Sequence, residues 1–480
     1  MKKLLILIAL ICSLFILASC GGGGGGGDGG DDNNLAALSS LNITDAKSIF
    51  ISSRSYQTKS SGMNSSSREN KPPADLYKVL ESGEIDIVDF LDSGHKKIKL
   101  YINGGEVYPV YILNINEDFI FVGFTYVEIS PESFFSPSSG LSFAGAVLVK
   151  KSNGAVYKIK SLPFRSVGGS GSIVNSNTGI KGLIKSDALG NIYYLSDPYD
   201  DPNYSYSDTG GYTLSGIRKV NLGSATTSVI SPSTEAVFGF EVDDSGNILY
   251  EGVSVYTHDQ VCKLRSSAGV YKNINIDPLN PMNAIWKGYD GLIYYCQSGE
   301  RYDGSIFSYV PITEIKRINS NTLEAEPYGS FDGSMFINNG YGSETTQINL
   351  KGNTYIIAGG IYEVYNSTSS PRIVSLAGLS IQRIYCVAAT DNYYFIAGRD
   401  DSSNYFLAKI TPGGNEYVKI LGNEYQVYSF SASETDGIIF NALRVADGKK
   451  IIGKVPINGG IVTMLDEESN TQVYCLERIR

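Results

Sequence analysis

Tyrosines and carboxylates are concentrated in one short segment of the chain, Asp197 to Asp208. The candidate binding residues in it are Tyr199, Asp200, Asp201, Tyr204 and Tyr206. Tyrosine rings stack on sugars or on apolar peptide side chains, and carboxylates accept hydrogen bonds from hydroxyls or bind Ca²⁺. Because no Asp-x-Asp-x-Asp-Gly loop is present, the pattern favours recognition of a glycan or a peptide over a calcium site. A solvated turn whose tyrosines pack on the domain is the alternative.

Signals for catalysis, metals and cofactors are weak in the rest of the sequence. His95 and His258 are the only histidines, which argues against a multi-histidine metal site. Neither a Gly-x-Ser-x-Gly elbow nor a His-Glu-x-x-His motif occurs. The glycine-rich segment 167–172 lacks the Gly-Lys-Ser/Thr ending of a phosphate loop. A carboxylate pair for glycoside hydrolysis could be present among the 49 acidic residues, but no spacing marks one. We therefore predict no metal and no cofactor.

A repeated sequence pattern predicts the fold that would carry these residues. Eight times an apolar strand is followed by a turn of Asp, Gly or Asn and by a strand rich in Ile, Tyr and Phe, most clearly at 186–194, 244–250 and 289–295. A second pair of strands, joined by another Gly/Asn turn, follows most copies. Four antiparallel strands form a propeller blade, so the sequence predicts one all-β propeller. Strand tyrosines such as Tyr194 and Tyr294 are interpreted as packing between blades.

The two ends of the chain predict how the propeller closes. Residues 473–476 look like a first strand without successors, while 49–52, 76–80 and 84–88 look like second, third and fourth strands without a first. One blade shared by both termini would leave no open sheet edge. This count gives eight blades over residues 45–480. Seven is the alternative, because the spacing between 291 and 352 is irregular. The unit resembles the broad class of bacterial propellers with NHL-type and PQQ-type repeats, which implies fold only, and the Trp-centred motif of PQQ-type blades is missing.

One face of such a propeller carries the connections from second to third strand and from fourth strand to the next first strand. We expect most of these to be longer than the other turns, and long loops on a rigid scaffold are common binding sites. Arg301, Tyr302 and Arg399 fall in connections on this face, together with the segment 197–208. We therefore include these three residues among the candidate ligand-binding residues.

The N-terminal sequence predicts the cellular location of the protein. Lys2 and Lys3 precede a short apolar run that ends in Leu17-Ala18-Ser19-Cys20. This tetrapeptide resembles the lipobox of bacterial lipoproteins, which implies a signal peptide over residues 1–19, lipidation of Cys20 and a membrane anchor in the cell envelope. Gly21, in place of an inner-membrane retention Asp, favours the outer membrane. Residues 20–44, rich in Gly and Asp, are expected to form a disordered tether.

Composition and net charge limit the classes of partner that the protein could bind. The net charge of −10 and the absence of basic runs argue against nucleic acid. Cys262 and Cys296 lie in consecutive units and could form a disulfide, but buried free thiols are favoured. We predict a non-enzymatic cell-envelope lipoprotein that binds or scaffolds, recognising a protein or a glycan through its long-connection face. A secreted carbohydrate-active or other propeller enzyme, with acidic residues at the channel mouth, is the alternative.

Overall fold

The structure of the protein is a computed structural model. It describes residues 48–54, 75–79, 85–88, 101–102, 105–106, 108–125, 145–153, 156–159, 184–196, 216–221, 226–275, 282–333, 335, 346–357, 360–466 and 471–478. All regular elements in these ranges are β-strands. The fold is therefore all-β, as the alternating apolar pattern and the Gly/Asn turns predict.

The described strands form eight four-stranded antiparallel sheets and one two-stranded hairpin. The first sheet joins β34 (Thr471–Arg478), β1 (Ser48–Arg54), β2 (Asp75–Val79) and β3 (Ile85–Val88). The hairpin is β4 (Tyr101–Ile102) with β5 (Gly105–Glu106). The second sheet contains β6 (Tyr108–Asn114), β7 (Phe119–Thr125), β8 (Gly145–Lys150) and β9 (Val156–Ile159). The third contains β10 (Ile184–Ser186), β11 (Ile192–Ser196), β12 (Gly216–Asn221) and β13 (Thr226–Val229). The fourth contains β14 (Glu235–Val242), β15 (Ile248–Ser254), β16 (Gln260–Arg265) and β17 (Tyr271–Asn273).

The remaining four sheets follow the same up-and-down order. The fifth contains β18 (Met282–Lys287), β19 (Ile293–Asp303), β20 (Ser308–Asn319) and β21 (Glu324–Asp332). The sixth contains β22 (Thr346–Leu350), β23 (Asn353–Ile357), β24 (Ile361–Asn366) and β25 (Arg372–Ile373). The seventh contains β26 (Ile381–Ala389), β27 (Tyr394–Asp400), β28 (Tyr405–Ile410) and β29 (Tyr417–Leu421). The eighth contains β30 (Tyr425–Ser433), β31 (Gly437–Arg444), β32 (Lys449–Val455) and β33 (Thr463–Asp466).

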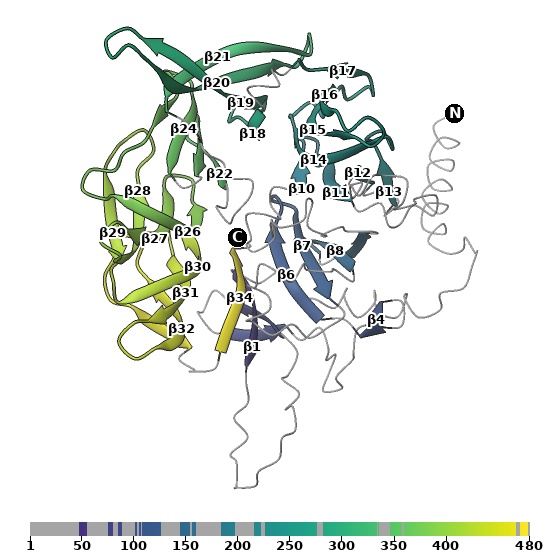
Figure 1. Ribbon diagram of the computed structural model, residues 1–480. Coiled ribbons are helices and arrows are strands. Elements are labelled where there is room, and N and C mark those ends of the chain that lie inside the picture. The colour runs from purple at the N-terminus through teal and green to yellow at the C-terminus, as the bar shows by residue number, and fades with distance from the viewer. Residues whose placement is uncertain are drawn as a thin grey trace, which may run out of the picture.

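The sheets succeed one another in chain order around a common centre (Figure 1). Apolar cores lie between consecutive sheets: one cluster joins Tyr193 of β11 with Tyr250 of β15, and another joins Trp286 of β18 with Val364 of β24. Burial of this shared apolar surface is what holds adjacent sheets together. The strand tyrosines Tyr194 and Tyr294 are fully buried, and Tyr294 packs against Tyr365 of the next sheet, as predicted for packing between blades.

The repeated sequence pattern corresponds to a recurring turn between the first and second strands of the sheets. In the turn after β10, the Asp187 carboxylate accepts hydrogen bonds from the backbone amides of Leu189 and Asn191 at 3.0 and 2.9 Å. The same design recurs after β14, where Asp243 accepts from Asn247. The turn after β18 contains Gly291 at φ 78°, and a Cβ there would lie 2.0 Å from the Asp244 side chain of the preceding sheet. Glycine is therefore required both for the backbone angle and for the approach of the two sheets.

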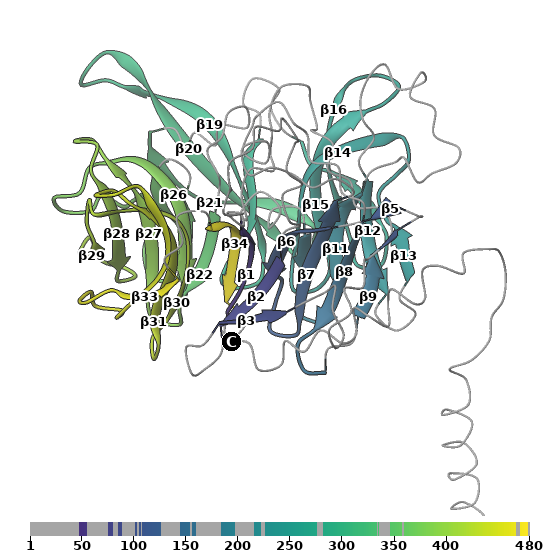
Figure 2. The same ribbon diagram turned by 90° about the horizontal axis from the view of Figure 1, so that it is seen from below.

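The two chain ends pair with each other as the sequence predicts. β34 forms an antiparallel ladder with β1, with Arg478 opposite Ser48 and Thr471 opposite Arg54. β34 supplies the first strand of a sheet whose other three strands come from the N-terminal part of the chain (Figure 2). The ladder occupies the hydrogen-bonding edge of β1 that a three-stranded sheet would leave open.

The expected difference in connection length is only partly correct. We call the side of the sheets with the first-to-second-strand turns the A–B edge, and the opposite side the B–C edge. Long second-to-third-strand connections occur after β1, β7 and β11, but the later ones at 304–307, 401–404 and 445–448 are as short as the A–B turns. The fifth sheet instead extends its strands β19 and β20 beyond the B–C edge (Figure 2).

Cys262, Cys296 and Cys386 form no disulfide, as favoured from the sequence. Cys262 and Cys296 are buried, and Cys386 is half-buried. Burial raises the pKa of the Cys262 thiol to about 12, with a further contribution from the charge of Glu251. A thiol that stays protonated is a poor nucleophile, so Cys262 acts as a small apolar core residue.

Candidate functional site

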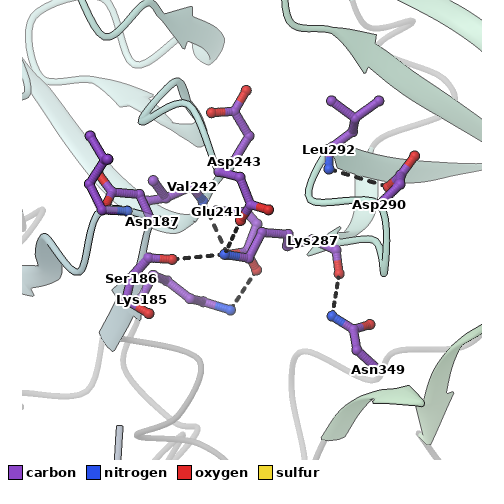
Figure 3. Close-up of polar contacts among 12 residues, drawn as sticks. Lys185, Ser186, Asp187, Glu241, Val242, Asp243, Lys287, Asp290, Leu292 and Asn349 are labelled. Atoms are coloured by element: carbon purple, nitrogen blue, oxygen red, sulfur yellow. Dashed lines mark hydrogen bonds and ion pairs between the residues drawn. The ribbon is translucent and has the colours of Figure 1, made fainter. Parts of the chain in front are cut away.

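The A–B edge carries a polar network between the first strands of four sheets (Figure 3). The Lys185 ammonium of β10 lies 2.6 Å from a carboxylate oxygen of Glu241 in β14. Lys287 of β18 donates to the Ser186 carbonyl at 2.8 Å and pairs with Asp244 at 3.1 Å. The Lys287 carbonyl in turn accepts a hydrogen bond from Asn349 of β22 at 3.3 Å.

These charged groups neutralise one another, which makes the network a structural cross-link. Glu241 is 2% exposed, so its charge depends on Lys185 and on the Val242 amide at 3.1 Å. Lys287 connects the third sheet with the fifth across the fourth and thereby fixes their relative positions. The lysines and carboxylates of this network are already paired, so we do not assign it a ligand.

Substitution of Lys185 tests how much its ion pair with Glu241 contributes to the free energy of unfolding. We expect Lys185→Ala to lower the free energy of unfolding by about 1–3 kcal/mol, because Glu241 then loses its cation in a buried site. Lys272→Ala is the matched control: its pair with Glu324 is 40% and 65% exposed, and the change should stay within about 0.5 kcal/mol. Urea denaturation followed by the fluorescence of Trp286, the single tryptophan, measures both. Equal effects of the two substitutions would contradict the cross-link.

Other buried carboxylates are also engaged in structural bonds. Glu235 binds Lys263 and accepts from the Tyr250 hydroxyl at 2.7 Å, and Glu363 binds Arg372. Glu251 differs, because burial alone raises its pKa to about 7. Its cross-strand neighbours are Gly239 and Cys262. Neither of these two direct partners carries a carboxylate.

Arg301 and Tyr302 lie together in the extension formed by β19 and β20. Arg301 forms an ion pair with Asp332 of β21 at 2.8 Å. Tyr302 lies opposite Tyr309, and the two rings meet edge to face with centroids 5.4 Å apart. These two predicted residues therefore belong to one hairpin that projects from the B–C edge (Figure 2).

The end of this hairpin exposes a group of large apolar side chains. We call it the hairpin tip. Its members and their exposed fractions are Tyr302 53%, Ile306 58%, Phe307 83% and Tyr309 65%. Phe307 has a φ of 51°, an unusual backbone angle for a bulky residue. Exposed apolar and aromatic residues grouped on a projecting hairpin are typical of protein contacts.

Sequence reasoning missed Ile306, Phe307 and Tyr309. A signal was present: residues 302–309 read Tyr-Asp-Gly-Ser-Ile-Phe-Ser-Tyr, in which Asp-Gly marks a hairpin between aromatic residues. The apolar residues fall in and beside the turn, where no neighbouring strand can cover them.

Arg399 lies in a different sheet, near the end of β27 at the B–C edge. It is opposite Tyr405 of β28, and its guanidinium is 6.0 Å from the centre of that ring. The structure therefore does not place Arg399 in the same hairpin as Arg301 and Tyr302. The other predicted site residues, Tyr199, Asp200, Asp201, Tyr204, Tyr206 and Cys20, lie outside the described residues.

Within the described ranges, no group of three or more His, Cys, Asp or Glu side chains is placed to hold a metal ion. The same ranges contain no helix that is long and apolar enough to cross a membrane.

Neither a protein-family model nor a curated protein matches the chain. Similar solved structures include a puromycin-hydrolysing peptidase of Mycobacterium tuberculosis (12% identity, TM-score 0.40), matched over 75% of this chain and 53% of that one. The β-propeller domain of the Trilobed protease from Pyrococcus furiosus (10%, 0.39) is matched over 75% and 98%. TolB from Acinetobacter baumannii (13%, 0.28) is matched over 76% and 80%. The chain spans about half the length of the Mycobacterium peptidase. Likenesses this remote carry no conclusion about activity.

Proposed function

We propose that the chain is a lipid-anchored protein of the bacterial cell envelope, in the outer membrane, that binds a partner protein without catalysis. The domain is a closed propeller of eight blades, and its B–C edge is the recognition face. The hairpin tip is the observation that carries the proposal, because a large apolar group at the end of a rigid projection has no role in the core.

The direction of β1 supports an orientation for this face. Ser48, where β1 begins, lies opposite Val79 at the end of β2 and Arg478 at the end of β34, so β1 starts at the A–B edge. A tether from Cys20 to this point would therefore join the domain on the side away from the hairpin tip. For the 25 residues of the proposed tether, the r.m.s. reach of a flexible chain is about 25–30 Å. That length favours a domain whose tip points away from the anchoring membrane.

Lipidation is tested at Cys20. We expect Cys20→Ala to remove palmitate labelling and to release the protein from the membrane fraction, because the acyl chains supply the anchor. Cys12→Ala is the control, since Cys12 lies in the proposed signal peptide and should leave both properties unchanged. If the Cys20→Ala protein stays in the outer-membrane fraction, the proposed anchor is wrong.

Closure is tested by removing β34. Deleting residues 471–480 would leave β1 with an unpaired edge and remove a strand that both neighbouring sheets need. We expect aggregation or a fall in Tm of roughly 5 °C or more. Deleting only residues 479–480, which follow β34, is the matched control and should leave Tm within about 1 °C. Equal melting of the two shortened chains would contradict the closed arrangement.

Recognition is tested at the hairpin tip. We expect Ile306→Ser with Phe307→Ser to reduce capture of a cross-linked envelope protein by about tenfold or more, since buried aromatic anchors carry much of an interface's affinity. Folding should be unaffected, because both side chains are exposed.

Leu189→Ser provides the matched control for that experiment. Leu189 is 83% exposed, as Phe307 is, but it lies in a turn at the A–B edge. Its substitution should leave capture unchanged. Loss of capture with Leu189→Ser and not with the tip variant would assign recognition to the opposite edge.

A further inference from the structure

Two arginines face each other across β26 and β27 near the B–C edge. Arg383 and Arg399 are direct cross-strand partners. Like charges directly opposite each other destabilise a sheet. Among the described residues, neither guanidinium forms an ion pair with a carboxylate. The nearby Asp400 carboxylate instead accepts hydrogen bonds from Asn404 at 2.8 and 3.3 Å.

Two tyrosines pack against this arginine pair, and a third lies on the adjoining strand β30. The Arg383 guanidinium lies 5.6 Å from the ring centre of Tyr385, and Arg399 lies over Tyr405. The rings of Tyr385 and Tyr405 are 6.4 Å apart at an interplanar angle of 42°. Tyr428 belongs to β30 of the next sheet, which packs against β26 and β28. Burial raises the pKa of Tyr428, with smaller contributions from Tyr405 and Tyr385. The Nε of Arg399 donates a hydrogen bond to the Ser403 carbonyl at 3.2 Å. Stacking on the tyrosine faces holds both guanidiniums in place, and their terminal NH₂ groups can still donate to a ligand.

The backbone turns two of these tyrosines out of the regular strand pattern. Tyr385 has no ladder partner between Ile384 and Cys386, and Tyr428 has none between Val427 and Ser429. Each is the extra residue of a β-bulge. Bulges re-aim side chains and are frequent beside functional sites. Tyr428 lies on β30, the first strand of the eighth sheet, and its side chain remains 43% exposed.

We propose that Arg383, Arg399, Tyr385, Tyr405 and Tyr428 form a binding site for an acidic sugar, a uronic acid residue of a glycan. The sugar carboxylate lies between the two guanidiniums and accepts hydrogen bonds from both. The apolar face of the pyranose ring packs on Tyr428, and the tyrosine hydroxyls meet the sugar hydroxyls. This site is separate from the hairpin tip. It relies on the proposed function only in that both use the B–C edge.

The chemistry favours a uronic acid over two other anions. A glutamate or aspartate side chain offers a carboxylate but no ring face for the exposed tyrosine. A nucleic acid strand requires a line of cations along its phosphates, and the net charge of −10 opposes it. Two adjacent arginines with an exposed aromatic ring match one carboxylate on one sugar ring.

The test uses the full chain and a hexamer of galacturonic acid, with its methyl ester as the uncharged probe. Isothermal titration calorimetry should detect the acidic hexamer, with affinity that falls as salt is added. The methyl ester should bind at least tenfold more weakly. Arg399→Gln and Tyr428→Ser should each reduce affinity about tenfold or more, while Tyr428→Phe should retain most of it because the ring face remains. Lys272→Gln, which removes an exposed cation of β17 outside both sites, should have no effect.

Several results would overturn the site. These are absence of hexamer binding to the wild-type chain, equal binding of the methyl ester, or unchanged affinity in both Arg399→Gln and Tyr428→Ser with melting as in the wild type. Equal or tighter binding of hexaglutamate would assign the arginine pair to an acidic peptide instead. Capture of the protein partner through the hairpin tip is read separately, so either proposal can fail without the other.

Discussion

The ladder between β1 and β34 is the interaction on which the arrangement of the sheets depends. Every other four-stranded sheet is assembled from consecutive strands, so its backbone hydrogen bonds can form locally. The first sheet forms only when residues near 50 meet residues near 475. Loop closure over such a separation is entropically costly, and this pairing is therefore expected late in folding. Once formed, it brings β34 against β30 on one side and β6 on the other, so that both neighbouring sheets gain a packed face.

The two edges of the sheets differ in how their charges are used. At the A–B edge, Lys185, Glu241, Lys287 and Asp244 satisfy one another across sheet boundaries. A buried charge of this kind is stable only when it is paired, so this edge cannot change partners without a cost in stability. At the B–C edge, Arg383 and Arg399 face each other instead, and the apolar hairpin tip is exposed. The charges of the A–B edge are thus satisfied within the chain, whereas the B–C edge presents a like-charge pair and exposed apolar side chains.

The sequence predicted the repeating unit well because its signal is local. A carboxylate at Asp187 or Asp243 must bond the amides of its own turn, and Gly291 must adopt a positive φ, so these positions can be identified without knowledge of the fold. The same logic located the shared sheet, since an isolated strand at the C-terminus matched a missing first strand at the N-terminus. Both inferences depend only on strand alternation and turn chemistry.

The parts of the site that were missed depend on the tertiary structure. A β-bulge inserts one residue into a strand, and nothing in the alternation around Tyr385 or Tyr428 marks which tyrosine loses its ladder partner. The pairing of Arg383 with Arg399 depends on that register, because without the two irregularities in β26 the opposing residues would shift. The sequence could therefore propose Arg399 as a binding residue but could not supply its companions. The bulges lie in the first strands of the seventh and eighth sheets, which pack against each other, and this arrangement brings separate surface residues into the proposed uronic acid site.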